Sequence, residues 1–177
     1  MITDGWVLPD KEMPYDPRFD LIGCLAAFHS FLRNYRCGGK PFDIFMRDEC
    51  KAHNVNVRVI LPFLQMGSGL LSRKQEPGPG AMKRAVLLPD RGAIVGGSFE
   101  GQIVNCVSSF RKFYEKADLV EPYQCHDGVA LAKSRTSYAV LAYVGRLGQA
   151  GYPDSGCHLY LRHFNQLGRF SKWVVGK

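Results

Sequence analysis

The chain has 177 residues, of which 46 % are apolar and 12 % aromatic, so it is long enough to bury the core of one globular domain. This composition excludes an intrinsically disordered chain. The formal net charge of +7 favours a polyanionic partner, such as nucleic acid, an anionic membrane surface or the phosphate-rich bacterial cell wall, although a basic protein that is merely soluble is the alternative.

The first half of the chain predicts an irregular arm followed by helices. Residues 1–16 are rich in Pro, Asp and Gly and predict an N-terminal arm, which precedes a helical domain over residues 17–177. Apolar residues at helical spacing predict a first helix over 17–37, ended by Gly38 and Gly39. Pro41 opens a second helix over 41–54, and a third begins at about Asn56. Pro62 lies inside the third helix, where we expect a kink.

The second half continues the helical pattern after a break. A loop rich in Gly and Pro follows the third helix, and residues 84–97 predict a small irregular or β segment. Ser98 is a candidate cap for a strongly amphipathic helix over 98–117, and two more helices are expected over 133–148 and 156–170. The pattern predicts a mainly α single domain of about six helices.

No export signal, membrane span or cofactor motif is present in this sequence. The N-terminal 20 residues lack a basic start followed by an apolar stretch, and no apolar run reaches the roughly 20 residues that a transmembrane helix needs. We therefore expect synthesis in the cytosol without a signal peptide. Neither a phosphate-binding loop nor a G-x-S-x-G elbow occurs, and we predict no cofactor.

The six cysteines are spread singly along the chain. Cys125-His126 and Cys157-His158 contain the ligand types that zinc prefers, but adjacent residues rarely reach one ion, so we predict no metal site. Cys24 with a distant histidine is a conceivable nucleophile pair, although any chain with six Cys and five His contains such pairs. Buried free thiols are the favoured interpretation.

Residues 49–73, "ECKAHNVNVRVILPFLQMGSGLLSR", resemble the catalytic helix of lysozyme-like glycoside hydrolases that cut peptidoglycan. The resemblance is closest to glucosaminidase and lytic transglycosylase domains. Three later segments agree in order, namely "LLPDRGAIVGGSFEGQIVNCVSSFRKFY", "TSYAVLAYVGRLG" and "GCHLYLRHFNQLGRF". The resemblance implies a single lysozyme-like domain that associates with peptidoglycan.

The chain departs from this family at the catalytic position. In the match, Gln65 takes the place of a family Gln, and Gly67 takes the place of the catalytic Glu, followed by Ser68 and Gly69. Glycosidic cleavage needs a carboxylic acid in a partly dry pocket, where its raised pKa lets it protonate the leaving oxygen. Gly67 cannot do this, and the Gly-Ser-Gly stretch has a structural interpretation as a helix cap. Weak candidates for a displaced acid are Glu76, Asp90 and Glu100.

We therefore expect a degenerate, non-catalytic peptidoglycan-associated protein that binds glycan or serves as a structural component of a phage particle or a secretion machine. Two alternatives stay open: an active hydrolase or lytic transglycosylase with a displaced acid, and a basic helical module that binds nucleic acid or a protein partner. The glycan contacts implied by position are Gln65, Gly67, Ser68, Gln102, Tyr138 and Tyr143. For the two tyrosines, packing in the core is the alternative.

Overall fold

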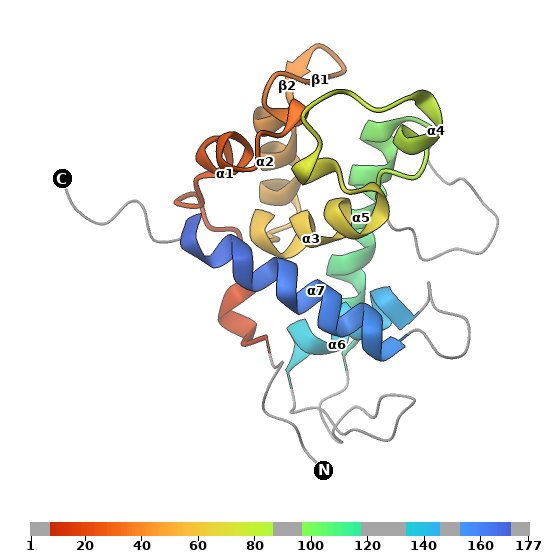
Figure 1. Ribbon diagram of the computed structural model, residues 1–177. Helices are drawn as coiled ribbons and strands as arrows, with labels where there is room; N and C mark the ends of the chain where they lie inside the picture. The colour runs from red at the N-terminus through yellow and green to blue at the C-terminus, as the bar shows by residue number, and fades with distance from the viewer. Residues whose placement is uncertain (1–7, 87–96, 118–133, 146–152, 171–177) are drawn as a thin grey trace.

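The computed structural model describes residues 8–86, 97–117, 134–145 and 153–170. These residues form seven α-helices and one two-stranded antiparallel hairpin, which confirms the mainly α class (Figure 1). In chain order the elements are α1 (Leu21–Ala27), β1 (Arg36–Cys37), β2 (Lys40–Pro41), α2 (Phe42–Ala52), α3 (Val57–Ser68), α4 (Pro79–Met82), α5 (Phe99–Lys116), α6 (Arg135–Gly145) and α7 (Pro153–Leu167). Among the described residues, no helix is both long and apolar enough to cross a bilayer.

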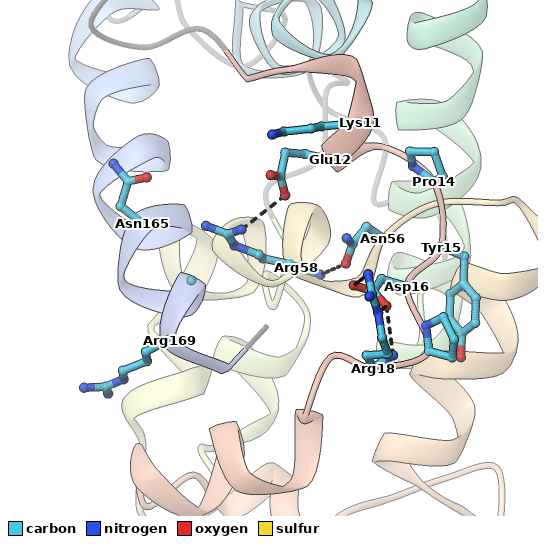
Figure 2. Close-up of a pocket in the computed structure, with 12 residues that line it drawn as sticks. Lys11, Glu12, Pro14, Tyr15, Asp16, Arg18, Asn56, Arg58, Asn165 and Arg169 are labelled. Carbon is cyan, nitrogen blue, oxygen red and sulfur yellow. Dashed lines mark hydrogen bonds and ion pairs between the residues drawn. The ribbon is translucent and has the colours of Figure 1, made fainter. Parts of the chain in front are cut away.

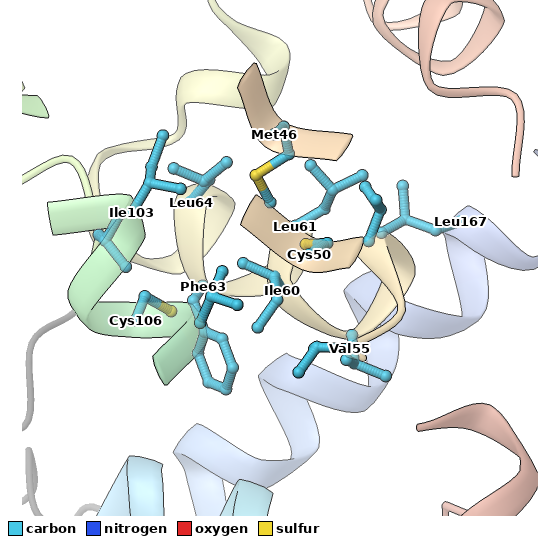
Figure 3. Packing of buried hydrophobic residues seen from close by; sticks show 14 of the residues in the cluster. Met46, Cys50, Val55, Ile60, Leu61, Phe63, Leu64, Ile103, Cys106 and Leu167 are labelled. Carbon is cyan, nitrogen blue, oxygen red and sulfur yellow. The ribbon is translucent and has the colours of Figure 1, made fainter. Parts of the chain in front are cut away.

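Helix α3 is the centre of the core. Its side chains from Val59 to Leu64 are all buried, and α7 lies across it (Figure 1). The ring of Phe63 packs against Tyr143 of α6, Tyr160 of α7 and Phe110 of α5, with centroids 4.4, 4.9 and 5.8 Å away. Figure 3 shows part of the hydrophobic cluster around Phe63, which includes Met46, Cys50, Ile103, Cys106 and Leu167. One apolar helix thus contacts side chains of four other helices.

The interior proline of α3 lies beside a hydrogen bond from α7. Pro62 is buried within the helix, which continues through it to Ser68. Because proline has no N–H, the carbonyl four residues earlier loses its helical donor. The hydroxyl of Tyr160 donates to the neighbouring carbonyl of Val59 at 2.7 Å. A side chain 101 residues later thus satisfies part of the backbone of α3 near the proline.

The single helix predicted over 17–37 is wrong. Asp20 caps α1 by accepting from the N–H of Gly23 at 2.8 Å, and α1 ends at Ala27. His29 has a positive φ of 51°, which breaks the helix. The hydroxyl of Ser30 then donates to the carbonyl of Leu70 at 2.9 Å, which fixes the start of a 3₁₀ turn, η3 (Phe31–Arg33). The hairpin of β1 and β2 follows.

The second half of the predicted N-terminal arm packs into the domain. Leu8 and Met13 are buried, and the N–H of Leu8 donates to the hydroxyl of Ser137 at 2.9 Å. Oδ1 of Asp10 accepts from the hydroxyl of Ser134 at 3.0 Å, and from the N–H and hydroxyl of Thr136 at 2.9 and 3.1 Å. Asp10 thereby caps the start of α6 from 124 residues away in the chain.

The segment between α3 and α5 differs from the predicted loop. The short helix α4 lies within the stretch that is rich in Gly and Pro. Of the predicted irregular or β segment over 84–97, residues 87–96 lie outside the described residues. The hairpin that the structure does contain lies at residues 36–41, where the sequence predicted only the end of one helix and the start of the next.

We predict that Asp10→Ala lowers the free energy of unfolding by about 1–2 kcal/mol, because three donors at the start of α6 lose a charged acceptor. Asp48→Ala is the control, since Asp48 forms only an exposed ion pair with Lys40 at 3.1 Å and such pairs contribute about 0–1 kcal/mol. Urea unfolding of both variants checks this, and equal losses would contradict the capping role of Asp10.

Candidate functional site

The last turn of α3 contains the residues that the family resemblance singled out. Gly69, not Gly67, is the left-handed cap, with φ 68°, and its N–H donates to the carbonyl of Gln65 at 3.0 Å. Gly67 and Ser68 therefore lie inside the helix. Nε of Arg73 donates to the carbonyl of Ser68 at 2.8 Å and satisfies one of the last carbonyls. We call Gln65, Gly67 and Ser68 the α3-end site.

The α3-end site contains two buried polar atoms without a partner. Nε2 of Gln65 donates to the hydroxyl of Ser72 at 2.9 Å. Oε1 of Gln65 and the hydroxyl oxygen of Ser68 have no hydrogen-bond partner in the part of the chain that the structure describes. A buried polar atom left unpaired costs about 1–3 kcal/mol, and most buried polar atoms in native proteins have a partner. The last turn of α3 thus contains polar side-chain atoms that lack a partner among the described residues.

Two of the three candidate acids lie near one tyrosine. Oε1 of Glu100, in the first turn of α5, accepts from the N–H of Gly38 at 3.1 Å in the hairpin turn. Burial, then Glu100, Cys37 and Glu76, raise the pKa of Tyr35, so both carboxylates lie within electrostatic range of its hydroxyl. Glu76 is exposed. Asp90 lies outside the described residues.

The loop after α3 leads from the α3-end site to the region that contains Tyr35 and Glu76. The N–H of Phe31 donates to the carbonyl of Arg73 at 2.7 Å, so η3 lies against the segment that follows α3. The ring of Tyr35 packs edge-on against Phe31 and Phe99, with centroids 5.7 and 5.5 Å away. Glu100 is therefore positioned by α5 and the hairpin, whereas Glu76 lies in the loop between η4 (Leu70–Ser72) and α4.

Two of the expected glycan contacts belong to the core. Gln102 is fully buried; its Oε1 accepts from the N–H of Val86 at 3.3 Å, and its Nε2 donates to the carbonyl of Met82 at 2.8 Å. Tyr143 is also fully buried, which raises its pKa well above the ordinary value. Because neither side chain is accessible, both are removed from the predicted contact set. Tyr138, on α6, is half-buried.

Four cysteines are free and buried, namely Cys24, Cys37, Cys50 and Cys106. Burial raises the pKa of Cys24, Cys37 and Cys106 to about 12. The thiolate is the nucleophilic form of cysteine, so Cys24 does not form the nucleophile pair considered from the sequence. Within the described residues, no group of three His, Cys, Asp or Glu side chains is placed to hold a metal ion.

A cavity of about 1140 Å³ lies at the other end of α3 (Figure 2). It is bordered by residues 11, 12 and 14–18, by Asn56 and Arg58 at the start of α3, and by Asn165, Gly168 and Arg169 at the end of α7 and just beyond it. Nη1 of Arg58 forms an ion pair with Oε2 of Glu12 at 3.1 Å. Sequence reasoning missed this cavity, because its three walls come from distant segments that share no motif.

Comparison with protein-family models, with curated proteins and with solved structures gives no significant match. The likeness to lysozyme-like hydrolases thus stays an expectation from the sequence. The structural features that bear on function are the unpaired polar atoms at one end of α3 and the charged cavity at the other.

We predict that Cys24, Cys37, Cys50 and Cys106 resist alkylation in the native protein at pH 8, because they are buried and burial raises the thiol pKa. Peptide mass spectrometry after treatment with iodoacetamide measures this, with the protein unfolded in guanidinium as the control in which all four react. Rapid alkylation of Cys24 in the folded protein would contradict this prediction and would support a role for Cys24 as a nucleophile.

Proposed function

We propose that this chain is a lysozyme-like domain that binds the glycan strands of peptidoglycan at the α3-end site without cleaving them. The observation that carries the proposal is the pair of unpaired polar atoms, Gln65 Oε1 and Ser68 Oγ, on either side of Gly67. The family resemblance supplies the ligand class, because the same turn holds the acid in enzymes of that family.

Sugar hydroxyl groups suit these two atoms. A hydroxyl can donate to the amide oxygen of Gln65, and the hydroxyl of Ser68 can both donate and accept. Both residues are partly exposed although the two atoms are buried, so a ligand reaches these atoms only after a change of rotamer. Binding then removes the free-energy cost of two unsatisfied groups, which favours the complex.

The residues around Gly67 support binding without cleavage. A general acid needs a partly dry pocket beside the glycosidic oxygen. Gly67 has no side chain, Glu100 accepts a hydrogen bond from the backbone of the hairpin, and Glu76 is exposed to water. The net charge of +7 also suits a protein that meets a phosphate-rich wall. A component of a phage particle or of a secretion machine fits this role.

A second candidate, an active hydrolase with a displaced acid, is favoured by one observation. Glu76 and Glu100 both act to raise the pKa of Tyr35, and a glycosidase typically uses two carboxyl groups. In this case Glu100 is the general acid, because it is partly buried whereas Glu76 is exposed. Glu100→Gln would then abolish any cleavage by the native chain.

We predict that the native chain sediments with purified peptidoglycan and releases no muropeptides, whereas Gly67→Glu releases them. The new carboxylic acid stands where the family has its own. Gly67→Gln is the matched control, because glutamine has the size of glutamate without the carboxylic acid. Both variants replace a glycine inside a helix, and this replacement stabilises the helix by about 0.5–1 kcal/mol in each case. Release by the native chain would favour the second candidate, and absence of sedimentation would refute glycan binding.

We also predict that Ser68→Ala weakens sedimentation with peptidoglycan while the free energy of unfolding stays unchanged or rises, because the substitution removes an unpaired buried hydroxyl. Ser108→Ala is the control, since the hydroxyl of Ser108 donates to the carbonyl of Asn105 at 3.3 Å on α5. That variant is expected to lose about 0.5–1.5 kcal/mol of stability and to bind normally. The opposite result for Ser68, lower stability with normal binding, would make it a structural residue.

A further inference from the structure

The cavity at the start of α3 is separate from the α3-end site. Asn56 and Gly67 stand at opposite ends of one helix, roughly 16 Å apart at 1.5 Å per residue. The cavity lies between η2 (Asp10–Glu12), the segment 14–18, the first turn of α3 and the end of α7. A ligand there would not contact Gly67.

The residues that line the cavity carry an excess of positive charge. Four cations, namely Lys11, Arg18, Arg58 and Arg169, stand against two carboxylates, Glu12 and Asp16. Asp16 is paired with Arg18 at 2.9 Å, and Glu12 with Arg58 at 3.1 Å. Among the described residues, Lys11 and Arg169 have no carboxylate partner. An anionic ligand is therefore favoured over a cationic one.

Arg58 is the most buried charge in this wall. Its side chain is only 13 % exposed, and the guanidinium lies 3.9 Å from the ring centroid of Phe164. Burial lowers the pKa of Arg58, although Glu12 and Tyr160 act to raise it. Glu12 thus compensates the buried charge incompletely, and a further anion beside the guanidinium would stabilise it.

The remaining walls contain both polar and apolar residues. Figure 2 shows the side chains of Lys11 and Arg58 extending toward α7 on the side of Asn165, with Glu12 between them. Half of the other lining residues carry charged or amide side chains, which are hydrogen-bond partners for hydroxyl groups, namely Asp16, Arg18, Asn56 and Arg169. Small-molecule pockets are usually apolar and of about 300–1,000 Å³, so a cavity of this size and polarity suits a hydroxylated ligand that is larger than a bare phosphate ion.

We propose that this cavity binds a phosphate ester of a sugar or polyol, with the phosphate beside Lys11 and Arg58 and the hydroxyl groups toward Asn56 and Asn165. A phosphate monoester carries about −1.5 to −2 charges at pH 7, which matches the excess of two positive charges among the lining residues. Arginine and lysine are the usual partners of phosphate oxygens. This inference does not depend on glycan binding at the α3-end site.

Isothermal titration calorimetry with glycerol 3-phosphate tests the proposal, with glycerol as the probe that lacks the phosphate. We expect saturable binding of glycerol 3-phosphate and none of glycerol. Lys11→Gln is expected to weaken the binding about tenfold or more, because a charge-assisted hydrogen bond is lost. Lys83→Gln is the matched control: it removes the same charge from an exposed lysine after α4, outside the cavity, and is expected to change the affinity less than about twofold.

Two results would overturn the proposal. The first is the absence of saturable binding of glycerol 3-phosphate. The second is equal weakening by Lys11→Gln and Lys83→Gln, because binding would then depend on the net charge of the protein and not on this cavity. Titration with poly(glycerol phosphate) separates the sources of the ligand. Tighter binding of the polymer, again weakened by Lys11→Gln, identifies a wall polymer, and binding of the monomer alone identifies a soluble phosphate ester. Because no peptidoglycan is present, failure of glycan binding would leave these results unaffected.

Discussion

The burial of α3 is the constraint on which the rest of the structure depends. From Val59 to Leu64 every side chain is buried, so no side of the helix is exposed to water in its middle. Helices α2, α5, α6 and α7 all pack against it. A helix of this kind needs its polar backbone ends to be satisfied outside the core. The polar side chains of α3 therefore lie at the two ends of the helix.

The two ends of α3 differ in how their polar groups are satisfied. At the start, Asn56 accepts from the N–H of Arg58 at 3.0 Å, and Arg58 is held by Glu12 and by the carbonyl of Phe164. At the other end, Arg73 satisfies a carbonyl, but the side chains of Gln65 and Ser68 keep unpaired atoms. The first end carries an excess of positive charge, and at the second end two neutral side chains keep polar atoms without a partner among the described residues. This difference suits a phosphate ester at the first end and a neutral sugar at the second.

Local signals were enough to predict several helices. Ser98 accepts from the N–H of Gly101 at 3.1 Å, and Asn56 caps α3, as the spacing of polar and apolar residues indicated. The break in the helix predicted over 17–37 was not predictable, since it depends on a contact between Ser30 and Leu70. In the same way, the order Gln65, Gly67, Ser68 is visible in the sequence, but only packing shows that two of their polar atoms lack a partner.

The contact between α3 and α7 also has a consequence for synthesis. Tyr160 follows Val59 by 101 residues, and at about 5–20 residues per second the ribosome needs roughly 5–20 s to make the intervening chain. During that interval the nascent chain contains an apolar helix whose covering partner does not yet exist. Exposed apolar surface of this kind promotes aggregation, so the yield of folded protein in a cell depends on how well chaperones cover α3 until α7 emerges.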